Sequence, residues 1–380
     1  MDNIIFRSYK KGDEKDLADL FNITFQTGGG FVRTPKSWYW RYVQSPGFEP
    51  RMCQIAEDIK KNKIVGVVYA NLIEFTPIDG KKYLVGDIND LSCHPDYVKQ
   101  GIATALMKKA IDYMVEKGCD FSLLSTGFKR FARNKIYKKL GYTDVEKEIL
   151  LFQFPFPFQL IKNIYALGIF LPILLFFSYI PRFLNRIRIK NHRFFDDFSY
   201  EINFNEKHSK FFKSINRIIS KNYEGFPKYD IPKFKWARIN VPGKRYKPTY
   251  IIIKKGETVV GGGVFTFQNI YMFKYGLKMR ISIIHEIFLD YTYFKNERDL
   301  HLGYIYLIDK IIRAANKRFL GIVIHNTSQK AYRLIKGFQG MNFLKVQSDV
   351  VMVKGLKSNI KLPQITKPLF VPTYLSLGFP

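Results

Sequence analysis

The chain has 380 residues, enough for two domains of ordinary size, and 47% of them are hydrophobic, which excludes general disorder. Its formal net charge is +29, of which roughly +5 lies in residues 1–150 and roughly +24 in the rest. This charge fits a lysine-rich soluble surface or an anionic membrane; nucleic acid is disfavoured because no nucleic-acid-binding motif accompanies it. The three cysteines have neither disulfide nor zinc spacing, so we expect no metal and a reducing, cytoplasmic compartment.

The first half of the chain reads as strands alternating with helices. An apolar run with strand character ends at His94-Pro95. A short loop carrying Gly101 and Ala103 follows, and then a helix with Ile102, Leu106 and Ala110 on one face. A strand, a small-residue loop and a helix aim free backbone N–H groups and the positive end of a helix dipole at one point, which suits a phosphate or pyrophosphate.

Two further elements follow in an order that carries more information than the loop alone. Residues 119–125 read as a buried strand, and residues 132–142 as a short helix that Gly141 closes at its C-cap. This order resembles the GNAT N-acetyltransferase family over residues 3–152. The family's coenzyme A loop, Arg/Gln-x-x-Gly-x-Gly/Ala, falls on residues 98–103, with Val98 in place of the usual Arg or Gln, and its helix pattern Asn-x-x-Tyr-x-x-x-Gly-Phe/Tyr falls on residues 134–142.

The resemblance implies an acyl-coenzyme A donor, with acetyl-CoA as the expected donor substrate. It assigns the pyrophosphate to the backbone of the loop and helix start, formed by Val98, Lys99, Gln100, Gly101, Ile102, Ala103 and Thr104. It places the thioester carbonyl at Leu91, Ser92 and Cys93, at the end of the central strand. Tyr137 becomes the general acid that protonates the leaving thiolate, although a plain core tyrosine is the alternative; Asn134 would contact the pantetheine arm or simply be exposed.

The general base is the least determined role. Asp90 lies on the central strand beside the expected acyl position and is the first choice, with Glu74 or no dedicated base as alternatives. A regular strand would place Asp87, three residues earlier, on the opposite face from Asp90. We interpret His94, before a proline, as a turn residue.

A hydrophobic segment joins the two halves. Ile164–Ile180 contains no charged residue, Pro172 would kink it, and Arg182, Arg186, Arg188 and Lys190 follow it. The segment is short for a bilayer crossing, and a crossing would separate the two halves. The remaining interpretations are a buried or dimer-forming helical pair and a segment that dips into a membrane interface.

The second half repeats the first weakly. Trp40 and Trp236 both begin Trp-x5-Pro-Gly, and at the same separation a glycine-bearing strand recurs and Glu286 falls where Asp90 stands. A helix over Leu302–Lys317, a strand over Leu320–Ile324, and residues 341–343 echoing 140–142 complete the repeat. The second copy lacks a glycine between Asp290 and Leu302, and no tyrosine matches Tyr137.

These patterns predict a mixed α/β protein in which two GNAT-like domains, each a central mixed β-sheet flanked by helices, are joined by a hydrophobic helical segment. We expect an acyltransferase domain at 1–152, the linker at 153–195, a degenerate copy at 196–360 and a tail at 361–380. The predicted activity is N-acyl transfer by direct attack of a small amine, amino sugar or amino-lipid precursor within a ternary complex. The alternatives are a non-catalytic coenzyme A-binding protein and an aminoacyl transferase that uses charged tRNA. A homodimer and a peripheral position at the inner face of a membrane are further expectations.

Overall fold

The computed structural model describes residues 3–25, 32–78, 81–163, 165–203, 249–272, 277–317, 320–334 and 336–358, and between these also 214, 216–218, 220–221, 226–227, 232 and 236. The predicted tail at 361–380 and the repeated Pro242-Gly243 lie outside the described residues.

The first half follows the predicted alternation of strands and helices. Its elements are β1 (Ile4–Ser8), α1 (Glu14–Phe25), α2 (Pro35–Tyr42), β2 (Cys53–Asp58), β3 (Lys63–Ile78), β4 (Lys81–Cys93), α3 (Ile102–Glu116), β5 (Phe121–Gly127), the π-helical turn η4 (Arg133–Tyr137) and β6 (Thr143–Gln153). The predicted C-cap is confirmed, because Gly141 has a φ of 88° after a short 3-10 turn.

A helical segment and a second set of strands follow. They are α4 (Pro157–Asn163), the 3-10 helix η6 (Tyr165–Phe170), α5 (Leu171–Lys190), β7 (Phe198–Asn203), β8 (Phe226–Pro227), β9 (Thr249–Lys255), β10 (Thr258–Met272), β11 (Leu277–Leu289), α8 (Glu297–Lys317), β12 (Ile322–Ser328), α9 (Gln329–Leu334), α10 (Gly337–Gly340) and β13 (Leu344–Gly355). The predicted kink at Pro172 is wrong: this proline lies in the first turn of α5, where its missing N–H has no helical partner to lose, and the proline inside the helix is Pro181.

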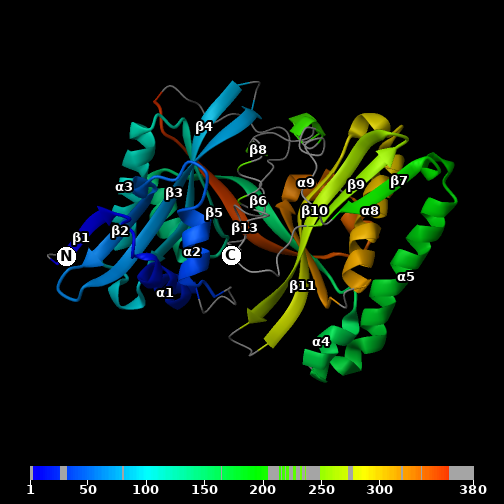
Figure 1. The fold of residues 1–380 in the computed structure, drawn as a ribbon, viewed down its shortest axis with the longest axis horizontal. Helices are drawn as coiled ribbons and strands as arrows, with labels where there is room; N and C mark the ends of the chain where they lie inside the picture. Colours follow the sequence, from blue (N-terminus) through cyan, green and yellow to red (C-terminus); the bar gives the residue numbers. More distant parts are fainter. Residues whose placement is uncertain are drawn as a thin grey trace.

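The strands form one continuous mixed sheet with a symmetric order. The order is β1-β2-β3-β4-β5-β13-β6-β12-β11-β10-β9-β7, and β8 pairs with β3 outside this path (Figure 1). Each half therefore receives a strand from the other: β13 lies beside β5, and β6 lies beside β12. The predicted mixed sheet is confirmed. The ranges 1–152 and 196–360 stay a prediction about chain segments, because the sheet itself runs through both.

The two halves are built alike in detail. β4 and β11 have 13 residues each, and each carries a β-bulge against its neighbour, β3 or β10. Gly141 and Asn342 occupy the same turn and both have positive φ, 88° and 53°. Trp40 and Trp236, 196 residues apart, exchange hydrogen bonds: each indole Nε1 donates to the other's carbonyl, at 3.1 and 2.7 Å. Such a reciprocal contact is what a two-fold relation between two copies produces.

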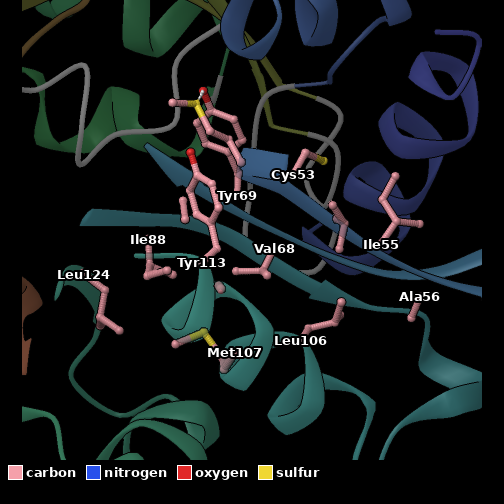
Figure 2. Packing of buried hydrophobic residues seen from close by; sticks show 14 of the residues in the cluster. Cys53, Ile55, Ala56, Val68, Tyr69, Ile88, Leu106, Met107, Tyr113 and Leu124 are labelled. Carbon is pink, nitrogen blue, oxygen red and sulfur yellow. Dashed lines mark hydrogen bonds between the residues drawn. The ribbon is translucent and has the colours of Figure 1, made fainter. Parts of the chain in front are cut away.

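Helix α3 packs on one face of the first half-sheet. Its buried side chains Leu106 and Met107 lie against Val68 and Ile88 of β3 and β4 (Figure 2). The helix lies close to β4 because Gly86 has no side chain: a Cβ there would overlap the Met114 sulfur. Asp87, the next residue, therefore points to the opposite face of the sheet.

Candidate active site

β4 and β5 part midway along their length. They run parallel and pair from Val85–Ile88 to Phe121–Leu124, and no pair joins them past Ile88. Beyond that point β4 stays with β3, while Ser125 and Gly127 of β5 pair with β13. The edge of β4 that faces β5 is thereby released from strand pairing, so its backbone groups are available to an extended ligand.

A bulge turns the backbone of β4 at this point. Val67 pairs with Ser92 and Tyr69 with Asn89, so two residues, Asp90 and Leu91, oppose one residue of β3. Asp90 has a φ of 50°, in the left-handed region that aspartate tolerates better than most side chains. The bulge lies where the sequence places the thioester carbonyl, at Leu91, Ser92 and Cys93. Bulges re-aim backbone and side chains next to active sites.

The bulge also changes which residues share a face. The strand is not regular, so the condition for the expected opposition of Asp87 and Asp90 is not met, and the charge of Arg41 acts on both carboxylates. Arg41 lies 3.6 Å from the Asp90 carboxylate, and its charge opposes the raised pKa of Asp87. Arg33 makes a closer ion pair with Asp90, at 2.6 Å. Sequence analysis missed both arginines, which come from the chain around α2.

Asp87 has a pKa suited to proton transfer at neutral pH. It is 2% exposed, and burial raises its pKa to about 7, against the hydrogen bond that Asn89 donates to it at 2.6 Å. The Asp90 carboxylate is instead held by guanidinium groups. A base works best when its pKa lies near the operating pH.

The loop before α3 has the geometry expected of an anion site. Lys99 and Gly101 have positive φ, 66° and 81°, and Gly101 is the N-cap residue of α3. The first helical turn therefore presents the N–H groups of Ile102, Ala103 and Thr104, and it contains no acidic residue. Val98 is exposed, so the departure from the family pattern leaves the backbone of the loop intact.

Tyr137 lies at the end of the π-helical turn and is buried. Burial and the charge of Asp90 raise the pKa of Tyr137, so its hydroxyl is a neutral donor near the β4 bulge. Within the described part of the chain, no hydrogen bond joins this hydroxyl to another side chain. Asn134, on the same turn, is exposed. His94 caps the turn after β4, as predicted, by accepting from the Asp96 N–H.

The second half keeps the packing around Tyr137 and loses its hydroxyl. In the first half the rings of Tyr137 and Tyr142 meet edge to face, with centroids 6.1 Å apart. In the second half Phe338 and Phe343 make the same contact at 4.9 Å. A ring at this position is thus sufficient for the fold. The hydroxyl is an addition that the packing does not require.

The start of α8 is unsuited to a phosphate. Glu297 and Asp299 lie in its first turn, and Asn296 accepts the Asp299 N–H at 2.9 Å. Acidic side chains and a capping oxygen already occupy the positive end of this helix. This supports the prediction that the second copy does not hold a coenzyme A.

A line of polar residues crosses the middle of the sheet on the face that carries Asp87. Strand pairing puts Asp87, Leu123 and Ser125 on one face, and Ser125 donates a hydrogen bond to Glu148 of β6 at 2.6 Å. Burial raises the pKa of Glu148 to about 7, and Asp349 and Glu146 act in the same direction. Sequence analysis missed Glu148, because only the exchange of strands brings β6 and β13 beside the point where β5 leaves β4. Among the described residues, no group of three or more His, Cys, Asp or Glu is arranged to hold a metal ion.

Comparison with known proteins agrees with this geometry. Residues 15–142 match the acetyltransferase (GNAT) family. An uncharacterized N-acetyltransferase of Methanocaldococcus jannaschii is 27% identical over 144 residues, which are 36% of this chain and 59% of that relative. The N-myristoyltransferase of Saccharomyces cerevisiae, solved with bound myristoyl-CoA, superposes with a TM-score of 0.66 at 12% identity, over 93% of this chain and 79% of that one. A GCN5-related N-acetyltransferase of Anabaena variabilis superposes with a TM-score of 0.58 at 13% identity, over 93% and 73%.

The fold is therefore that of the GNAT acyltransferases. Within the chain, the match to the acetyltransferase (GNAT) family covers residues 15–142.

Proposed function

We propose that the protein is an acyl-coenzyme A-dependent N-acyltransferase, with acetyl-CoA as donor and a primary amine as acceptor. The observation that carries this proposal is the parting of β4 from β5 at a bulge, with the N-terminus of α3 at one end and the Tyr137 hydroxyl near the other side. One strand edge can then hold the pantetheine arm while the helix start holds the pyrophosphate.

Each step of direct transfer has a group suited to it. The acceptor amine loses a proton and attacks the thioester carbonyl, an N–H of the β4 bulge stabilises the oxyanion, and the C–S bond breaks. Tyr137 donates its proton to the departing thiolate. We assign proton uptake to the pair Asp87 and Asp90, which share Arg41, rather than to Asp90 alone, with Asp87 as the acceptor and Asp90 holding the bulge through Arg33.

The acceptor class follows from the charges on the same face of the sheet. Asp87, Ser125 and Glu148 lie on one face beside the parting strands, and the buried carboxyls favour a cation over an anion. An ammonium group that enters here could deliver its proton to either carboxylate. We therefore retain a small amine, an amino sugar or an amino-lipid precursor as acceptor, in the cytoplasm and beside a membrane. A homodimer stays a prediction.

The test is mass spectrometry of the purified protein with acetyl-CoA and a library of amines, repeated with longer acyl-CoA donors. Acetylated product, with free coenzyme A released in equal amount, supports the proposal. Turnover only with the longer acyl-CoA donors would show that acetyl-CoA is not the donor. Bound coenzyme A without product from any amine would favour the non-catalytic alternative, and activity only with charged tRNA would favour the aminoacyl transferase.

A further inference from the structure

Helix α5 turns polar residues toward the protein and apolar residues toward the outside, whereas a surface helix of a globular protein does the opposite. Together with α4 and η6 it forms a segment along the outer edge of the second half, beside α8 (Figure 1). We call these three elements, residues 157–190, the arm. The inner side and the outer side of the arm differ in polarity.

The inner side of α5 is polar. Ser178 donates a hydrogen bond to the Phe154 carbonyl at 2.7 Å, and Asn185 donates to the Gly340 carbonyl at 2.6 Å. Arg182 is 2% exposed, and its Nε donates to the Ser178 carbonyl at 2.5 Å. The contacts of Ser178 and Asn185 fix the helix to the body of the protein, whereas the Arg182 bond closes on the helix itself.

The outer side of the arm is apolar. Its exposed side chains recur every three or four residues, the spacing of one helix face, and each is at least 41% exposed: Ile169, Phe170, Ile173, Phe176, Phe177, Ile180, Phe183, Leu184 and Ile187. Gly168–Lys190 is also the one helical stretch, among the described residues, that is long and apolar enough to cross a membrane, and only 17% of its most apolar window is buried. A continuous apolar stripe of this kind marks an interaction site.

The sheet rules out a crossing of the folded protein. β6 precedes the arm and β12 follows it, and the two strands are hydrogen-bonded neighbours from Glu148 with Ser328 to Gln153 with Val323. A crossing helix would put these strands on opposite sides of a bilayer. The arm can contact a membrane only from one side.

Charge distinguishes a membrane from a second copy of the chain. Lys162, Arg188, Lys190 and Arg193 are exposed at the two ends of the stripe. Two stripes packed together would bring these cations against each other in a chain of net charge +29, whereas an anionic headgroup layer would neutralise them.

We propose that the arm lies in the plane of an anionic membrane, with its apolar stripe at the boundary between headgroups and acyl chains. The polar inner side keeps the body in water above the surface. Burial of the apolar stripe and attraction of the flanking cations to anionic headgroups both contribute to binding, since either one alone gives only marginal attachment. This inference does not depend on the proposed activity.

Flotation of the full-length protein with vesicles tests it. We expect binding to phosphatidylcholine vesicles that contain one part in three of phosphatidylglycerol, about tenfold less binding without the anionic lipid, and loss of binding in high salt. The double variant Phe176→Ser, Phe183→Ser should lose binding to both vesicles. The triple variant Arg188→Gln, Lys190→Gln, Arg193→Gln should lose the preference for the anionic vesicles.

The matched control is Lys10→Gln, Lys11→Gln, Lys15→Gln, which removes three exposed cations from the other half and should bind as the unchanged protein does. Coenzyme A binding and the melting temperature should be unaltered in all variants, because every substituted side chain is exposed. Two results would overturn the proposal: no binding to either vesicle, or a dimer in sedimentation that dissociates in the Phe176→Ser, Phe183→Ser variant, which would identify a second copy as the occupant.

Discussion

Asp87→Asn should make the protein more stable and less active, and the gain in stability should depend on pH. Asp87 is buried, and burial raises its pKa from 3.8 to about 7. The folded state thus binds this proton more tightly than the unfolded state does. The free energy of unfolding therefore falls as the pH rises from about 4 to about 7 and is constant above that range.

The size of the effect follows from the same pKa. One pH unit corresponds to about 1.4 kcal/mol, so ionised Asp87 costs about 4 kcal/mol at pH 8. An amide at this position carries no such cost and can still accept the hydrogen bond from Asn89. We expect the variant to be about 2–4 kcal/mol more stable at pH 8, because part of the gain is lost through less favourable hydrogen bonding, and equally stable near pH 4.

Urea unfolding of both proteins across this pH range measures the difference directly. Asp90→Asn is the matched comparison: it leaves the buried Arg33 without its carboxylate, so it should destabilise by about 3 kcal/mol at pH 8. Turnover of the Asp87→Asn variant should fall by about 10²–10⁴-fold and lose the inflection near pH 7. A stability difference that does not change with pH would refute the reasoning about burial. Full activity in the Asp87→Asn variant would show that Asp87 does not accept the proton of the amine.

Three further outcomes follow from the site. Coenzyme A should bind with one site per chain in calorimetry, and Gly101→Trp should abolish binding, because a side chain at a φ of 81° is strained and would fill the approach to the helix start; two sites would contradict the vacant second copy. Tyr137→Phe should lower turnover by about 10–1,000-fold, while coenzyme A affinity moves by less than about 1 kcal/mol, since Phe338 shows that a phenyl ring fits this position; unchanged turnover would leave Tyr137 a core residue. Residues 1–152 expressed alone should be insoluble or unfolded, because β5 and β6 lose β13 from between them; a soluble fragment with native-like circular dichroism would show that the exchanged strand is dispensable.

The features that were predictable from the sequence are those set by short-range chemistry. The loop and α3 follow from small residues placed before an apolar period, and the turn after Tyr137 follows from Gly141 at a position that needs positive φ. The second copy could be recognised because Asn342 tolerates the same left-handed turn and Trp236 repeats Trp40. The loop and turn signals each lie within about a dozen residues, the range over which propensity and periodicity act, and the repeat is recognised by comparing such short segments with one another.

What was missed depends on pairing between distant strands. The bulge that brings Asp87 and Asp90 to one arginine exists only in the register of β4 against β3, and an isolated strand pattern reads as regular. Glu148 reaches the site because β6 leaves its own half. The inner side of α5 is equally invisible in sequence, where Ser178 and Asn185 read as interruptions of an apolar run rather than as the residues that dock it.

The exchange of strands explains why a copy unsuited to coenzyme A is retained. β13 comes from the second half and lies between β5 and β6, so it supports β5 from the edge opposite to the opening that begins where β5 leaves β4. The same exchange places Glu148 of β6 beside Ser125 of β5, across a single strand. If the second half is the degenerate copy that the sequence predicts, we expect it to tolerate change at the start of α8 and at Phe338 better than in its last strand. In the proposed reaction, its contribution would be to the acceptor side of the site, because β13 pairs with both β5 and β6.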